Sequence, residues 1–218
     1  MSLESNLSHP PLSIKSPLAK LPTEVLPSIF AFPPNRDTLG GTAYLIVTNS
    51  GNLLVDSPAW NDTNRQFIVD RGGINWLAIT HRGSIGQAEK IATASNCEVI
   101  IHEQEAYLLP GLKVTTFQFE FDINDSIHAI WTPGHSPGSI CIYYAGAGGV
   151  LFTGRHLLPD SLGAAVPLRT AKTFHWLRQL RSVEAIWQQF PAQQPLAHIC
   201  PGANAGLLRG RGSIEIAL

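Results

Sequence analysis

Three features of the sequence together predict an α/β (α+β) fold. Strand-like and helix-like segments alternate in two sets, one ending near residue 109 and one beginning near residue 114. Polar or glycine-rich loops follow the strands expected to end at Asp56, Thr80, Trp131, Phe152 and Cys200. Finally, a chain of 218 residues that is 44% apolar and 14% charged has enough apolar side chains to bury a large core.

The first set starts with an apolar, β-prone segment at 25–32, which Pro33-Pro34 ends. Strands at 42–48 and 53–56 flank an Asn-Ser-Gly-Asn turn and predict a hairpin. Asn61 or Asp62 is a suitable cap for a helix that runs to about Arg71, where two glycines follow. The remaining elements alternate: strand 75–80, helix 85–95, strand 98–101 and a helical segment at 103–109.

The second set begins with strands at 114–121 and 126–131, joined by an Asp- and Asn-rich turn. Strands at 139–145 and 149–152 form a second hairpin, and 157–169 is expected to be irregular. Thr170 is the expected cap of the longest helix, 172–190, and a last buried strand covers 196–200. The helix has an apolar stripe that predicts a core-facing surface: Trp176, Leu180, Val183, Trp187 and Phe190.

The sequence predicts an extended N-terminal arm at 1–22 and a single domain at 23–218. The net charge of −1 provides no general attraction for nucleic acid or an anionic membrane, and no apolar run reaches the length of a membrane span. Residues 1–20 make a poor signal peptide. The three cysteines are far apart, which predicts reduced core thiols and a cytoplasmic protein: Cys97, Cys141 and Cys200. Nothing in the sequence decides the oligomeric state.

The segment with the clearest functional signal is TPGHSPG at 132–138. Its two prolines fix the backbone and remove two N–H donors, and its two glycines allow dihedral angles that a Cβ atom forbids. A strand enters this loop and another leaves it, so His135 is expected to be held at a fixed angle. A binding or catalytic histidine needs such placement.

Five segments resemble, in order, the motifs of the metallo-β-lactamase superfamily, which includes glyoxalase II and many other hydrolases. They are LLVD at 53–56, TH at 80–81, TPGHSPG at 132–138, LFTG at 151–154 and CPG at 200–202. The resemblance covers about residues 25–204. It implies a four-layer αβ/βα sandwich of two mixed β-sheets with helices on the outer faces. It also implies that Asp56 supports a histidine and that His81 and His135 occupy ligand positions.

Most of the metal ligands that the resemblance implies are absent. The second motif of the family continues with two more histidines and an aspartate, whereas 82–86 reads RGSIG. Arg155 stands where the family has a metal-bridging aspartate, and Ala203 stands where it has its last histidine. A catalytic zinc site normally has three protein ligands. We therefore expect no bound metal, the alternative being one zinc or iron ion on His81, His135 and His156.

Arg155 has two interpretations. Its guanidinium stays protonated and could form an internal ion pair with Asp56 that fills the vacated space. Alternatively, it lines a pocket for a carboxylate or phosphate. The second interpretation predicts a ligand-binding set made of His81, Arg82, His135, Arg155 and Asp56.

The predicted function is therefore that of a pseudoenzyme, a hydrolase-like protein with a degenerate metal site that binds a small anionic ligand or has a structural role. No serine or cysteine lies in a nucleophile motif, so no catalytic residue is predicted. Two alternatives remain open. One is an active hydrolase of ester, thioester or lactam type with a single metal on His81 and His135, and the other is a protein-interaction module.

Overall fold

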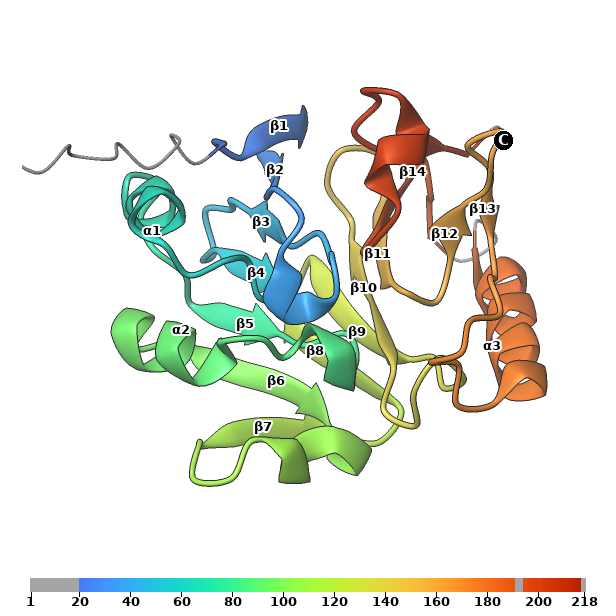
Figure 1. Cartoon of the computed structure of the whole chain (residues 1–218), viewed down its shortest axis with the longest axis horizontal. Helices are drawn as coiled ribbons and strands as arrows, with labels where there is room; N and C mark the ends of the chain where they lie inside the picture. The colour runs from blue at the N-terminus through green and yellow to red at the C-terminus, as the bar shows by residue number, and fades with distance from the viewer. Residues whose placement is uncertain (1–19, 191–193, 217–218) are drawn as a thin grey trace, which may run out of the picture.

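Two β-sheets lie face to face and carry helices on their outer sides (Figure 1). This computed structural model describes residues 20–190 and 194–216. The first sheet has seven strands in sequence order: β1 (Thr23–Leu26), β2 (Ile29–Ala31), β3 (Tyr44–Ile46), β4 (Leu53–Val55), β5 (Trp76–Ala78), β6 (Glu98–His102) and β7 (Val114–Phe117). Its strands pair antiparallel from β1 to β4 and parallel from β4 to β7, so the sheet is mixed.

The second sheet has six strands in the order β15-β14-β11-β10-β9-β8. They are β8 (Glu120–Asn124), β9 (Ile127–Trp131), β10 (Ile140–Tyr144), β11 (Val150–Gly154), β14 (His198–Pro201) and β15 (Ile214–Glu215). Neighbours pair antiparallel except for β11 and β14, which are parallel. Each sheet is therefore built from one continuous half of the chain.

Side-chain alternation along the strands creates the layers. In β3, Tyr44 and Ile46 face the second sheet and pack with Ile142 and Phe152, whereas Leu45 faces outward. The outward side chains of the first sheet pack against α1 (Asp62–Val69) and α2 (Ala88–Ser95). Those of the second sheet pack against α3 (Trp176–Gln189). The predicted four-layer sandwich with two mixed sheets is confirmed.

The short elements complete the chain. Four 3-10 helices are present in the described residues: η1 (Arg36–Thr38), η2 (Arg82–Ser84), η3 (Glu103–Leu108) and η4 (Ala205–Leu208). Asn61 caps α1 as predicted, by accepting a hydrogen bond from the amide of Asn64. Cys141 and Cys200 are buried thiols, as expected of core residues. No helix in the described ranges is long and apolar enough to cross a membrane.

Several predicted elements were wrong in detail. The strand expected at 114–121 is broken between β7 and β8, because the chain passes there from one sheet to the other. The segment 157–169 contains a small hairpin of β12 (Leu158–Pro159) and β13 (Ala165–Val166). The longest helix is capped by His175, which accepts from the amide of Arg178, and Thr170 instead forms a turn with Thr173. The predicted arm lies outside the described residues except for 20–22.

The apolar stripe predicted for α3 is only partly core. Val183 and Phe190 are buried against the second sheet. Leu180 and Trp187 are 37% and 39% exposed, because these positions lie on the outer side of the helix. Ile186 and the polar Gln179 take the buried places instead.

Candidate functional site

The ends of β5, β10, β11 and β14 are joined at one edge of the sandwich. The amide of Ile140 donates to the carbonyl oxygen of Thr80 across the two sheets at 2.8 Å, and the amide of Gly202 donates to Gly154 at 2.6 Å. Gly154 has φ of +50°, and a Cβ atom there would lie 2.4 Å from Thr80 Oγ1. The glycine is therefore needed for the loops to approach each other.

Asp56 supports this edge from within the first sheet. It has a left-handed backbone with φ of +62° and a buried carboxylate. The carboxylate accepts hydrogen bonds from Thr80 N and Thr80 Oγ1, both at 2.7 Å, and from Ser84 Oγ at 2.6 Å. Burial raises the pKa of Asp56 to about 6, although these hydrogen bonds and the charge of Arg155 lower it in part. Asp56 does not line the cavity described below.

The side chains of His81 and His135 face each other, with ring centroids 4.9 Å apart. Their Nε2 and Nδ1 atoms, respectively, are buried and have no hydrogen-bond partner in the described part of the chain. Burial, together with neighbouring positive charge, lowers the pKa of His81 well below its usual value and that of His135 to about 4. Both imidazoles are therefore neutral at pH 7.

The proton of the His81 ring can be assigned from its neighbours. Thr80 Oγ1 donates its hydrogen to Asp56, and it lies 3.3 Å from His81 Nδ1. A hydroxyl that has donated its hydrogen can only accept, so Nδ1 carries the ring proton. The Nε2 atom of His81 therefore presents a lone pair.

Backbone hydrogen bonds and close packing hold the loop that carries His135. The amides of Phe174 and His175 donate to the carbonyl oxygens of His135 and Gly134, at 3.0 and 2.9 Å. Gly134 has φ of +146°, and a Cβ atom there would lie 2.3 Å from the Cα atom of Gln179. The segment that leads into α3 is thereby fixed against the histidine loop.

Arg155 reaches across the cleft to the η1 connection between β2 and β3. Its Nη2 atom donates to the carbonyl oxygens of Leu39 at 2.7 Å and Thr38 at 3.3 Å, whereas its Nε atom is buried without a partner among the described residues. The ion pairs found in residues 20–190 and 194–216 are Arg65–Asp62 and His128–Asp122. The alternative of an internal Asp56–Arg155 ion pair is therefore not what the structure contains.

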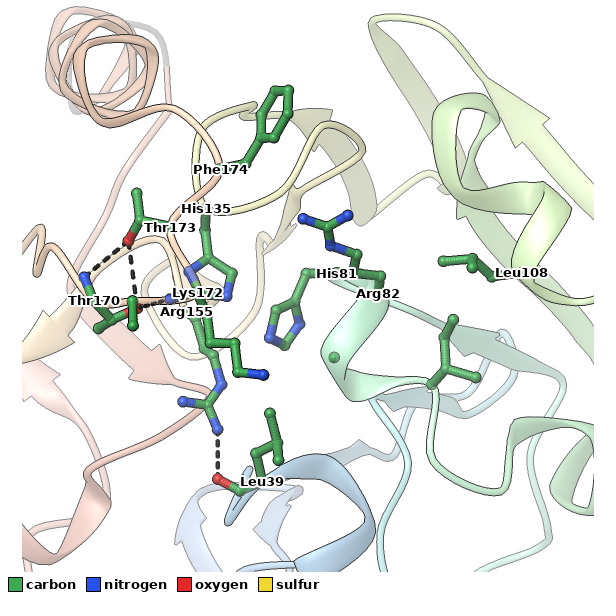
Figure 2. Close-up of a pocket in the computed structure, with 13 residues that line it drawn as sticks. Leu39, His81, Arg82, Leu108, His135, Arg155, Thr170, Lys172, Thr173 and Phe174 are labelled. Atoms are coloured by element: carbon green, nitrogen blue, oxygen red, sulfur yellow. Dashed lines mark hydrogen bonds between the residues drawn. The ribbon is translucent and has the colours of Figure 1, made fainter.

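These residues border a cavity of about 910 Å³ (Figure 2). Figure 2 shows His81, His135 and Arg155 gathered near its centre, with Leu39, Leu108 and Phe174 around them. Arg82 and Lys172 also line it, and within residues 20–190 and 194–216 no Asp or Glu does. Of the five predicted ligand-binding residues, the structure brings His81, Arg82, His135 and Arg155 to this cavity.

Sequence reasoning missed the contributions of Leu39, Leu108 and the 170–174 segment. These residues come from connections that lie far from the motifs in the sequence. The one available signal was Lys172, a cation in a polar stretch just before a helix, and charge alone does not place such a residue at a site. Ala203, which stands where the family has its last histidine, is buried and does not line the cavity.

The residues present do not fit the metal centre that the family resemblance implies. His81 Nε2 is a competent metal ligand, and the centroid of the His135 ring lies 4.9 Å from that of His81. In the described ranges, however, no three His, Cys, Asp or Glu side chains are grouped so as to hold a metal ion. The Arg155 guanidinium adds a fixed positive charge to the same cavity. This donor set lacks the carboxylate that a binuclear centre requires.

His156 lies behind the cavity rather than on its wall. It is 1% exposed, and neither ring nitrogen has a hydrogen-bond partner among the residues described. Burial and the neighbouring His135 lower its pKa to about 3. Gln179 donates to the carbonyl oxygen of His156 at 2.9 Å and leaves its own buried Oε1 without a partner in the same ranges.

Comparisons with known proteins agree with this fold. The chain is similar to a variant of the HARLDQ-motif metallo-β-lactamase from Cronobacter sakazakii (TM-score 0.61, 16% identity, 90% of this chain and 89% of that chain). It is also similar to an archaeal metallo-β-lactamase superfamily protein from Sulfolobus tokodaii (TM-score 0.58, 13% identity, 86% and 81%). A quorum-quenching N-acyl homoserine lactone lactonase gives a TM-score of 0.55 at 17% identity, over 74% and 78% of the two chains.

At these identities the likeness shows the fold alone. None of the curated proteins matches the chain. A family model, described as "Metallo-beta-lactamase superfamily", matches residues 36–192. The two sheets, the order of the five motif loops and this match lead to one assignment: the chain belongs to the metallo-β-lactamase superfamily.

Proposed function

We propose that this protein binds a small anionic ligand in the cleft and has lost the metal-dependent hydrolysis of its family. The observation that carries the proposal is the charge of the cavity wall. Arg82, Arg155 and Lys172 line the cavity together with two neutral imidazoles, and the lining residues that the structure describes include no carboxylate. Such a wall favours a carboxylate or phosphate group and disfavours a cation.

The position of Arg155 strengthens this argument. One of its nitrogens is bound to two carbonyl oxygens, so the guanidinium is held in place before any ligand arrives. Its remaining donors include a buried Nε atom without a partner in the described residues. At an effective dielectric constant near 20, unit charges about 4 Å apart interact by about 4 kcal/mol. The same charge therefore attracts an anion and repels a divalent metal ion.

Calorimetric titration with inorganic phosphate and with acetate tests the proposal. We expect weak binding to the unmodified protein and a loss of at least about tenfold in affinity for Arg155→Met. Arg36→Met is the matched control, since Arg36 is exposed and does not line the cavity. Elemental analysis of protein purified without chelators is the opposing test. Zinc or iron near one equivalent, lost in His81→Ala, would contradict the proposal.

A second candidate, a hydrolase with one metal ion, is favoured by a specific observation. Among the described residues, His81 Nε2 and His135 Nδ1 both lack hydrogen-bond partners, and their rings face each other at the same cavity. A lactonase is among the proteins of similar fold. This candidate predicts turnover of generic ester, thioester, lactam or lactone substrates. Chelator and His135→Ala should each abolish that turnover, whereas the ligand-binding proposal predicts none.

A further inference from the structure

We infer that the anion bound in this cleft is amphiphilic, with an anionic head, a neighbouring O–H or N–H group and an apolar chain. The inference rests on the proposed function and adds a ligand class to it. Its starting point is size. A cavity of about 910 Å³ is near the upper end of the roughly 300–1,000 Å³ typical of small-molecule sites, and is far larger than an inorganic anion requires.

The head of the ligand belongs at the inner part of the cavity, where the buried polar atoms lie. Arg155 Nε is a buried donor without a partner in the described residues, so it suits a carboxylate or phosphate oxygen. His81 Nε2 is buried and presents a lone pair, which an anionic oxygen cannot satisfy. A hydroxyl or amide N–H next to the anionic group satisfies it. Both buried groups are then paired by one ligand.

The apolar chain belongs at the mouth, where four separate segments each contribute an apolar side chain. They are Leu39, Ile85, Leu108 and Phe174. Leu39 and Phe174 are 59% and 53% exposed, so each leaves much of its apolar surface in contact with water. An apolar chain laid against them removes that surface from water, which is favourable in proportion to the area covered.

The backbone conformation of Leu39 is a second observation in favour of this ligand class. Its backbone is left-handed, with φ of +57°, a conformation that glycine or asparagine adopts more easily than leucine. The same residue places its carbonyl oxygen on Arg155 and its side chain on the cavity wall. Leu39, a residue with a strained backbone, thus links the anion-binding arginine to the apolar mouth of the cavity. A ligand with an anionic head and an apolar chain lies against both the arginine and the Leu39 side chain.

Titration with a matched series tests the inference. The probes are acetate, butanoate, hexanoate, octanoate, 3-hydroxyoctanoate, octyl phosphate and octyltrimethylammonium, all below their micelle concentrations. We expect affinity to rise with each methylene, by up to about fourfold, and to rise again with the 3-hydroxyl group. Octanoate against octyl phosphate identifies the preferred head group. Octyltrimethylammonium should bind at least about tenfold more weakly than octanoate.

Two variants and a control test where the apolar chain of the ligand binds. Leu39→Ser and Phe174→Ser should each flatten the dependence of affinity on the length of the ligand's apolar chain. Leu177→Ser should leave both that dependence and acetate binding unchanged, because Leu177 is 59% exposed on α3 and does not line the cavity. Thermal unfolding of each variant confirms that it is folded, and Phe174→Ser keeps the test valid if Leu39→Ser does not fold.

The outcomes separate the inference from the proposed function. Acetate and octanoate binding equally well, both dependent on Arg155, would overturn the amphiphilic ligand and leave the anion site standing. Octyltrimethylammonium binding as tightly as octanoate would also overturn it, since affinity would then not depend on the charge of the head group. Equal affinity for octanoate and its 3-hydroxy derivative would overturn the role of His81. Binding of none of the anionic probes would overturn both proposals.

Discussion

Two neighbouring regions at the cleft differ in whether their buried polar atoms have hydrogen-bond partners. Around Asp56, every carboxylate oxygen is hydrogen-bonded to Thr80 or Ser84. In the neighbouring region, His81, His135 and Arg155 line the cavity, and each leaves a buried nitrogen without a partner among the described residues. The first region has what a stable fold requires. The second has what a site requires when its remaining partners come from outside the chain.

The largest effect that tests this difference is expected for Asp56→Ala. The substitution leaves the amide and hydroxyl of Thr80 without their acceptor, at about 1–3 kcal/mol each, whereas Ser84 Oγ keeps the carbonyl oxygen of His81, so we expect the free energy of unfolding to fall by roughly 2–4 kcal/mol. Denaturation by urea measures it. Asp125→Ala is the control, because Asp125 is exposed, and it should change stability by less than about 0.5 kcal/mol. Similar losses in both variants would remove the distinction between the two regions.

The dependence of stability on pH sharpens the comparison. The pKa values of His135 and His156 are lowered to about 4 and about 3, and that of His81 is lowered as well. A lowered histidine pKa contributes stability above the unfolded value near 6.5, and this stability is lost as the pH falls through the folded pKa. Asp56, with its pKa raised to about 6, acts in the opposite direction by favouring the protonated folded state between about pH 6 and 4.

His135 and His156 against one aspartate leave a net difference of about one proton, and the lowered pKa of His81 adds to it in the same direction. We therefore expect the free energy of unfolding to fall by at least about 1 kcal/mol for each pH unit between 6 and 4.5. Urea denaturation at pH 7, 6 and 5 checks this slope. His135→Gln should reduce the slope by about one proton. A stability that stays constant from pH 7 to 5 would show that the imidazoles are not buried in their neutral form.

The smallest effect is expected for His156→Leu. Both nitrogens of this buried ring lack partners in the described ranges, so an apolar side chain of similar size removes a desolvation cost. We expect a gain of about 1 kcal/mol in the free energy of unfolding. The matched change at a partnered histidine, His102→Leu, should destabilise the protein, because His102 is bonded to Gln104 and Gln118 and is stacked on Trp131. Loss of stability in both variants would mean that His156 does have partners.

The sequence predicted most of the fold because apolar periodicity and turn residues act locally. Asn61 was found as a helix cap, and the strands at both sheet centres were found from their apolar runs. The passage from β7 to β8 was missed, since nothing local at Gln118 and Phe119 reveals that the chain changes sheets there. The start of α3 was misplaced because Thr170 and His175 are both able to cap, and contacts with the His135 loop decide between them.

The site was predictable where motifs mark it and not elsewhere. His81, Arg82, His135 and Arg155 line one cavity, as the order of strand ends implied. The partner of Arg155 was not predictable, because the carbonyl oxygens of Thr38 and Leu39 carry no side-chain signal. The exposure of the α3 stripe at Leu180 and Trp187 could also not be predicted from the sequence. Periodicity gives the width of an apolar face but not which part of it is covered.

Each sheet comes from one uninterrupted stretch of chain, and the hydrogen bond from Ile140 to Thr80 fastens the two together beneath the cavity. A polypeptide divided between Gln118 and Phe119 would give two pieces, each with an intact sheet and half of the cavity wall. Such pieces are natural candidates for fragment complementation. Recovery of octanoate binding on mixing them would report the docking of the sheets directly, independent of any enzymatic assay.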